Sequence, residues 1–175
     1  MQAIIDIFEA VRDFLEMGGD VLAVIAIVLC LMWVLIFERL AYFRGGHREM
    51  VQQALAKWAA RTERKSWQAH QIRAALISKT RMAANRFLPM IKTLVALCPL
   101  LGLLGTVTGM ISVFDVLAVS GTGNARSMAA GVSHATIPTM AGMVAALSGV
   151  FANVWLARFS KREIELLEDH LTLDP

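Results

Sequence analysis

The sequence predicts an all-α integral membrane protein with three transmembrane helices. Hydrophobic residues make up 57% of the chain and charged residues only 18%, whereas a soluble globular domain has about 25% charged residues. Charged side chains are absent from three long windows, at residues 21–37, 93–114 and 127–157. A helix needs about 20 apolar residues to cross a bilayer, with a lower limit of about 17, so each window can supply one span.

The windows and their flanks divide the chain into seven segments. We expect an amphipathic helix at 1–18, spans at 19–43, 89–117 and 127–158, a helical loop at 44–88, a short turn at 118–126 and a tail at 159–175. Gly18 and Gly19 supply the break before the first span. The acidic residues 1–20 do not look like a signal peptide, so we expect the first span to be retained.

The first segment has the spacing of an amphipathic helix. Its apolar residues recur every three or four positions, at Ile4, Phe8, Val11 and Leu15. This pattern favours a helix that lies along the membrane surface. A simple solvated start to the first span is the alternative.

Basic residues are concentrated between the first two uncharged windows, within residues 38–92. They stand at positions 39, 44, 48, 57, 61, 64, 65, 73, 79, 81, 86 and 92, and only Glu38, Glu49 and Glu63 oppose them. Loops rich in Lys and Arg stay in the cytoplasm. We therefore expect the N-terminus outside and the long loop and the tail inside. The loop is interrupted by Ala, Gln and Trp, so we do not expect it to bind nucleic acid.

The long loop also has helical apolar stripes, which could pack on each other or on neighbouring copies of the chain. One stripe contains Met50, Ala54, Leu55 and Trp58, and another begins at Trp67. The second helix has no strong break before residues 86–89, so we expect the second span to project into the cytoplasm.

No pattern in the sequence is typical of an enzyme. There is no HExxH, CxxC or Ser/His/Asp set, and GLLGTVTG lacks the GK[ST] ending of a phosphate-binding loop. Cys30 and Cys98 fall within apolar windows, where we expect them to fill the core. We predict no catalytic residue, no cofactor and no metal site.

Small residues line one face of each of the last two spans. The faces include Gly102, Gly105, Gly109, Gly131, Gly142 and Gly149, and kinks are expected at Pro99 and Pro138. Such faces let helix backbones approach closely in a membrane. We expect the second and third spans to pair antiparallel as an inner layer. The first span, which is rich in bulky residues, should lie outside against lipid.

Three polar side chains of the two inner spans are candidates for a functional role. Thr106 and Thr139 fall about 20 Å and 18 Å from the starts of their spans, which places both near the middle of the membrane. They could line a shared surface, or each hydroxyl could bond a carbonyl of its own helix. His134 is the readily titratable residue deepest in a span, and such residues are functional candidates. A neutral histidine satisfied by a neighbouring helix is the alternative.

Two segments in these spans carry a resemblance to a known family. CPLLGLLGTVTGM is similar to the P-x-x-G-L-x-G-T-V-x-G signature of the MotA/TolQ/ExbB proton-channel family, with Pro99, Gly102, Gly105 and Gly109 at signature positions. GVSHATIPTMAGMVAALSG is similar to the family's third span, which has a central Thr. The resemblance is strongest to the ExbB branch, which serves TonB systems in the bacterial inner membrane.

The resemblance implies a proton-driven motor subunit and not an enzyme. It implies a pentamer around a dimer of a single-span partner, ExbD, whose membrane Asp carries the proton, with force transmitted through TonB. Thr106 and Thr139 match the threonines that face the partner. His134 departs from the pattern, because well-known ExbB members have Glu there. A TolQ-like role in envelope integrity and a non-conducting scaffold for the partner are the alternatives.

Overall fold

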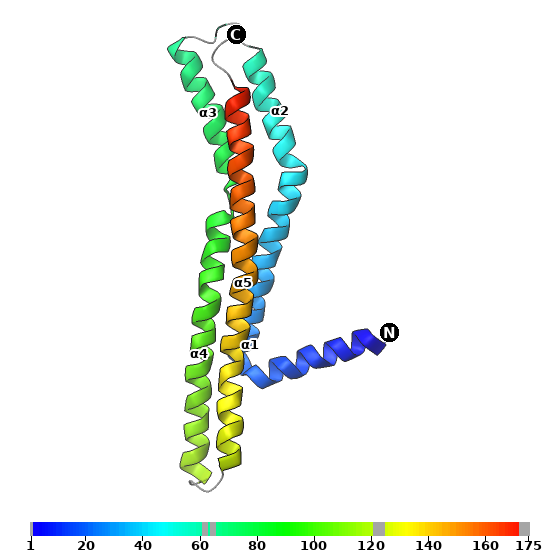
Figure 1. The fold of residues 1–175 in the computed structure, drawn as a ribbon, viewed down its shortest axis with the longest axis vertical. Coiled ribbons are helices and arrows are strands. Elements are labelled where there is room, and N and C mark those ends of the chain that lie inside the picture. Colours follow the sequence, from blue (N-terminus) through cyan, green and yellow to red (C-terminus); the bar gives the residue numbers. More distant parts are fainter. Residues whose placement is uncertain (1, 61–62, 64–65, 121–124, 172–175) are drawn as a thin grey trace. The chain divides into compact units, whose positions relative to one another are not determined.

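All regular structure in the part of the chain that the structure describes is helical. The computed structural model describes residues 2–60, 63, 66–120 and 125–171. Its helices are α1 (Gln2–Arg44), α2 (Gly46–Ala59), α3 (Trp67–Ala84), α4 (Leu88–Ser120) and α5 (Ala125–His170) (Figure 1). Three stretches of the described residues are helical, long and apolar enough to cross a membrane: Gly18–Arg44, Trp67–Ala118 and Gly131–His170. The predicted all-α fold with three spans is confirmed.

Helix α1 changes direction at Gly19. This residue has φ 64° and ψ −164°, a conformation that glycine adopts without the steric penalty of a Cβ atom. The segment before Gly19 runs in a different direction from the segment after it (Figure 1). The break therefore falls at the predicted glycine pair. The side chains of the expected apolar stripe at Ile4, Phe8, Val11 and Leu15 are outside what the structure describes.

A second break separates α3 from α4, and here the sequence prediction of an uninterrupted helix is wrong. Helix α3 ends at Ala84, and the backbone N–H of Leu88 donates to the carbonyl of Asn85 at 3.2 Å. Pro89 has no N–H with which to bond the same carbonyl in a continuous helix. Proline is well tolerated in the first turn of a new helix, so α4 restarts there.

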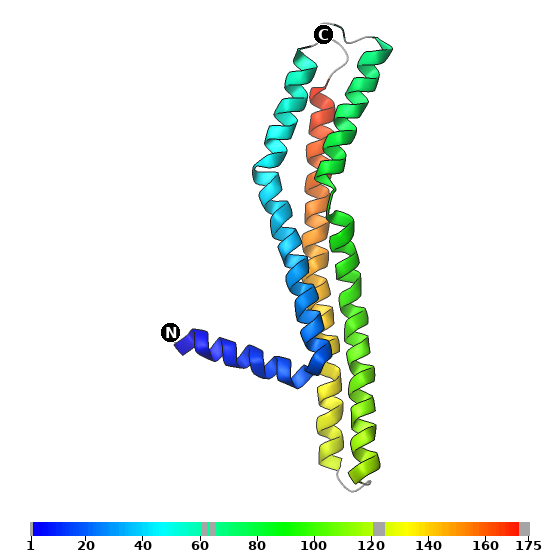
Figure 2. The same ribbon diagram turned by 180° about the vertical axis from the view of Figure 1, so that it is seen from behind.

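The chain forms two compact units. Met1–Trp33 and Thr93–Val150 make up the first unit, and Val34–Lys92 and Phe151–Pro175 make up the second. In the first unit, α4 lies beside α5 (Figures 1 and 2). Of the expected turn at 118–126, residues 118–120 and 125–126 are helical, and residues 121–124 are outside the described residues.

Polar and aromatic contacts connect the helices of the second unit. Ser160 of α5 donates to the side-chain oxygen of Asn85 at 2.9 Å, and the rings of Phe43 and Phe159 meet edge to face at 5.1 Å. Ala54 and Trp58 from the predicted stripe of α2 are buried. These contacts join α5 to the end of α1 and to the C-cap of α3, which lie far from it in the sequence.

Candidate functional site

The structure brings the small-residue faces of α4 and α5 together within the first unit. A methyl group added at Gly142 would lie 2.5 Å from the carbonyl oxygen of Cys98 and 3.2 Å from the Cα atom of Gly102. One added at Gly102 would lie 3.0 Å from the Cα atom of Thr139. The two backbones are thus in direct contact, and no side chain larger than hydrogen fits at Gly142 without a backbone shift.

The remaining glycines of these faces are also close to neighbouring helices. Gly105 lies against Pro138, Gly109 against Ala135 and Gly131 against Val113, whereas Gly149 lies against Met32 of α1 and Val95. Pro99 and Pro138 both lie inside helices that continue past them. Pro138 thus serves as a packing surface for α4 at Gly105.

Thr139 makes a hydrogen bond between the two inner helices. Its hydroxyl donates to the backbone carbonyl of Gly102 at 2.8 Å. A backbone carbonyl has two lone pairs, so it can accept this bond in addition to its helical one. The absence of a side chain at Gly102 lets Thr139 come close enough to reach it. The hydroxyl therefore holds α5 against α4 at this level.

Thr106 makes no such bridge. Its hydroxyl donates to the carbonyl of Leu103 in its own helix at 2.7 Å, which is the local alternative considered above. Thr106 lies one helical turn from Gly102, which bonds Thr139, so the two threonines are at nearly the same level. Both side chains are half-buried. The structure gives them different roles within one chain, because only Thr139 connects two helices.

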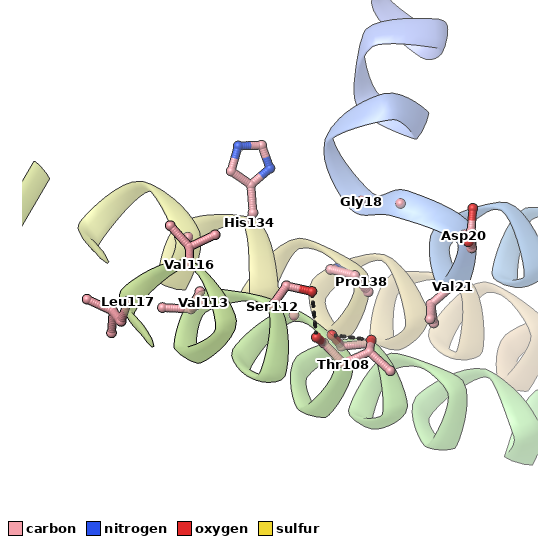
Figure 3. A pocket seen from close by; sticks show the side chains of 14 residues that line it. Gly18, Asp20, Val21, Thr108, Ser112, Val113, Val116, Leu117, His134 and Pro138 are labelled. Carbon is pink, nitrogen blue, oxygen red and sulfur yellow. Dashed lines mark hydrogen bonds between the residues drawn. The ribbon is translucent and has the colours of Figure 1, made fainter. Parts of the chain in front are cut away.

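His134 lies in other surroundings, at a cavity of about 660 Å³ in the first unit. The lining comes from α1, α4 and α5 and includes Asp20, Thr108, Ser112 and Pro138 (Figure 3). The His134 ring extends away from the side chain of Ser112 (Figure 3) and is exposed. Thr106 and Thr139 are not among the residues that line this cavity. The structure therefore does not place the three predicted polar residues on one surface of the chain.

The polar groups of this cavity favour hydrogen-bond donors as occupants. The hydroxyl of Thr108 donates to the carbonyls of Leu104 and Gly105, both at 3.1 Å, and that of Ser112 donates to the carbonyl of Thr108 at 3.2 Å. With their protons engaged, both oxygens keep lone pairs that can accept. Asp20 adds a carboxylate. The site can bind water or a cationic donor.

Asp20 is a site residue that the sequence analysis missed. Asp20 lies just before the first uncharged window, whereas the predicted polar residues all lie within the windows. The bend at Gly19 and the packing of α1 bring it to the same cavity as His134. An acidic residue directly after a helix-breaking glycine pair is the signal that could have identified it.

The two cysteines differ in their surroundings. Cys98 is fully buried and its thiol donates to the carbonyl of Leu94 at 3.3 Å, as expected of a core residue. Cys30 is exposed, so the expectation that it fills the core is wrong. Its helix face is not covered by other described parts of this chain. No cluster of His, Cys, Asp and Glu among the described residues could hold a metal ion.

Comparison with known proteins assigns the chain to a family. Residues 44–169 match the profile of the MotA/TolQ/ExbB proton channel family. The chain belongs to this family. Its members are channel and transport proteins of the bacterial inner membrane, and the three helices able to cross a membrane make this chain a multi-pass member. Thr106, Thr139 and His134 all lie inside the matched range, and Asp20 precedes it.

Two relatives in Synechocystis sp. are similar to part of the chain. The chain is 48% identical over 61 residues to a protein named ExbB-like 1, and 33% identical over 88 residues to one named ExbB-like 3. These matches cover 33% and 49% of this chain. They span only 24% and 41% of the two relatives' own lengths.

Proposed function

We propose that the chain is the channel-forming subunit of an ExbB-like proton motor in the inner membrane. One observation carries the proposal: the close α4–α5 pair, within a chain of the MotA/TolQ/ExbB family, brings Thr139 to Gly102, one helical turn from Thr106. Close backbone packing makes a rigid wall, and two hydroxyls on such a wall can contact a partner or water.

The proton-carrying acid comes from a second protein. The uncharged windows of α4 and α5 contain no Asp or Glu, so the threonines have no acid beside them along their own spans. An ExbD-like partner with one span and a membrane Asp would supply this group. Thr106 and Thr139 face that partner in the proposal, and His134 is a further polar residue of the same channel subunit.

Several copies of the chain surround the partner, and we expect a pentamer. Large apolar side chains on α4 and α5 are exposed in the single chain, among them Leu103, Val107, Phe114, Met140, Val144 and Leu147. These surfaces are available to lipid and to neighbouring copies. The distribution of Lys and Arg supports an orientation with the N-terminus outside and the second unit on the cytoplasmic side.

The motor would couple proton flow to TonB-dependent transport across the outer membrane. A TolQ-like role in envelope integrity predicts a different phenotype when the gene for this chain is deleted. Failure to grow when iron is limiting supports the TonB assignment, whereas sensitivity to detergents with normal growth at low iron supports the TolQ-like one.

The direct test of the proposed partnership is co-purification. A tagged copy of this chain is isolated in mild detergent from its native membrane, and the bound proteins are identified by mass spectrometry. We expect a single-span protein with an Asp in its span, in a fixed ratio to this chain. Recovery of the chain as a homo-oligomer without such a protein, under conditions that preserve the oligomer, would contradict the proposal.

A further inference from the structure

His47 is a buried histidine that the proposed proton path does not use. It lies in the first turn of α2, and its side chain is 2% exposed. Neither ring nitrogen has a hydrogen-bond partner. Buried polar groups are nearly always satisfied, so an imidazole with two unsatisfied nitrogens is unusual. An unsatisfied buried group of this kind destabilises the folded state, which calls for an explanation.

The surroundings of His47 are mainly aromatic. The rings of Tyr42 and Phe43 in α1 lie 6.1 Å and 5.5 Å from the imidazole, measured between centroids. Phe159 of α5 packs edge to face on Phe43. The titratable groups that face the imidazole from the described elements packed around it are Tyr42 of α1 and Glu163 of α5. This environment accepts a neutral imidazole better than a charged one.

Glu163 is near His47 but does not satisfy it. The distance from Nε2 of His47 to Oε2 of Glu163 is 3.5 Å, which is longer than an ordinary hydrogen bond of 2.7–3.2 Å. Burial lowers the pKa of His47 below 6.5, and the Glu163 carboxylate opposes this shift only in part. Proton binding to the buried ring is therefore less favourable than proton binding to an exposed one.

The backbone next to His47 can bend. Gly45 separates α1 from α2 and Gly46 is the first residue of α2, and both are exposed. Gly45 occupies the N-cap of α2 without a side-chain hydrogen bond to the helix, so the first turn lacks the stabilisation that Ser or Asp would give. Ala54 and Trp58, farther along α2, are buried and would hold the rest of the helix in place.

We propose that protonation of His47 moves its ring out of the aromatic site and unfolds the first turns of α2. We call this acid-dependent opening the release. A proton binds more readily to the exposed ring than to the buried one. By linkage, acid must then favour the open state. At pH well above 6.5 both states are neutral and the closed packing keeps its full stability. As pH falls below 6.5, that stability is progressively lost.

The release makes the conformation of the second unit depend on the local pH. If the proposed orientation is correct, this unit is on the cytoplasmic side, where protons arrive after crossing the membrane. Opening of α2 in response to acid would then couple proton arrival to a change of shape. Only this physiological role rests on the proposed function, because the release itself is a property of the chain alone.

Hydrogen exchange on the purified chain in lipid nanodiscs tests the release. Opening constants for residues 46–55 are compared at pH 7.5 and pH 5.5, after correction for the intrinsic rate of exchange. If the closed ring cannot bind a proton, the opening constant rises at most about tenfold over this range. We expect a several-fold rise in wild type and a larger one in Glu163→Gln, because that variant lacks the opposing carboxylate.

The matched variants are His47→Phe and His70→Phe. The first fills the aromatic site without a titratable group and should abolish the response to acid. The second changes an exposed histidine of α3 and should leave the response unchanged. An equal response in His47→Phe and wild type would overturn the proposal.

A second measurement does not depend on any variant folding correctly. The imidazole resonances of wild-type His47 are followed by NMR as the pH is lowered. We expect a midpoint below 6.5, and a midpoint at or above 6.5 would also overturn the proposal. Neither measurement needs a partner protein, so both outcomes are separate from that of the co-purification.

Discussion

The two units of the chain achieve close helix packing in different ways. In the first unit, glycines bring the backbones of α4 and α5 into contact, and a side-chain hydrogen bond from Thr139 to Gly102 crosses between these helices. In the second unit, charged and aromatic side chains reach across between helices. The difference follows the sequence. The uncharged parts of α4 and α5 in the first unit carry small residues that allow close backbone packing, whereas the second unit contains residues 38–92, which are rich in charged side chains.

Arg39 illustrates the second kind of packing. It is 2% exposed, and it donates to both carboxylate oxygens of Glu38 at 2.6 Å and 2.7 Å and to the carbonyl of Ala83 at 2.9 Å. Its guanidinium also lies over the rings of Tyr42 and Phe87, at 4.6 Å and 5.0 Å. The planar guanidinium suits such multiple bonding and stacking. One charged side chain thus links α1 to the end of α3 and to Phe87, in the short segment between α3 and α4.

The largest predicted effect comes from adding a methyl group to the first unit. Gly142→Ala places that methyl 2.5 Å from the carbonyl oxygen of Cys98, so the backbones must separate. We expect a loss of about 3 kcal/mol in the free energy of unfolding, at the upper end for overpacked cores. Unfolding by increasing fractions of denaturing detergent measures it.

Gly45→Ala is the matched control for this substitution. There the methyl would lie 4.0 Å from the carbonyl oxygen of Ala41, an ordinary contact. We expect a loss of at most about 1 kcal/mol, because alanine is less favourable than glycine at the N-cap of α2. If Gly142→Ala is no more destabilising than this control, the two inner helices do not pack as closely as described.

The next largest effect belongs to the second unit. Arg73 donates to the backbone carbonyls of Leu171 at 2.6 Å and Glu168 at 2.9 Å, and so satisfies the C-terminal end of α5. Arg73→Ala should cost about 2 kcal/mol of unfolding free energy, because two charge-assisted bonds are lost. Thermal unfolding followed by circular dichroism provides the measurement.

Arg81→Ala offers a comparison at the same helix end. Arg81 also pairs with Glu168, at 2.7 Å, but its side chain is 57% exposed. Exposed ion pairs contribute about 0–1 kcal/mol, so the loss should be smaller than for Arg73→Ala. Equal losses of unfolding free energy in the two variants would mean that the charge of these arginines stabilises the protein, and not the capping of α5 by Arg73.

The smallest effects on stability, and the most informative for function, are expected at the two threonines. Thr139→Val removes the bond to Gly102 and should cost about 1 kcal/mol, whereas Thr106→Val removes only a bond within its own helix and should cost almost nothing. Thr106→Val is therefore the cleaner test of function. We expect it to preserve assembly and to impair growth under iron limitation.

Thr139→Ser keeps a hydroxyl at the second position and serves as the control there. It should retain both the bond to Gly102 and activity. Normal growth of Thr106→Val and Thr139→Val together with wild-type assembly would contradict the proposed role of both hydroxyls.

The sequence predicted the first unit better than the second. Absence of charge and spacing of small residues are local signals, so the spans, the bend at Gly19 and the meeting of the small-residue faces could be anticipated. The distances of Thr106 and Thr139 from the starts of their spans were predicted from the rise per residue of a helix. The sequence prediction did not include the break before Pro89, because it rested on apolar spacing alone. The proline at this position indicates the start of a new helix.

Other features depend on contacts that no sequence pattern specifies. The burial of His47 requires Glu163 and Phe159, which are more than a hundred residues away in the chain. The position of Asp20 at the His134 cavity follows from how α1 packs after its bend. For the same reason, the sequence could not show that Thr139 bonds another helix whereas Thr106 bonds its own.

Proton flux tests the central claim most directly. The chain is reconstituted into liposomes alone, with its co-purifying single-span partner, and with a partner variant in which the membrane Asp is replaced by Asn. Internal pH is recorded with a fluorescent dye under an applied potential. The account predicts flux only when the chain and the unmodified partner are both present. No flux with the complete pair would contradict it and favour a non-conducting scaffold, and equal flux with the Asn variant would contradict the role of the partner's acid.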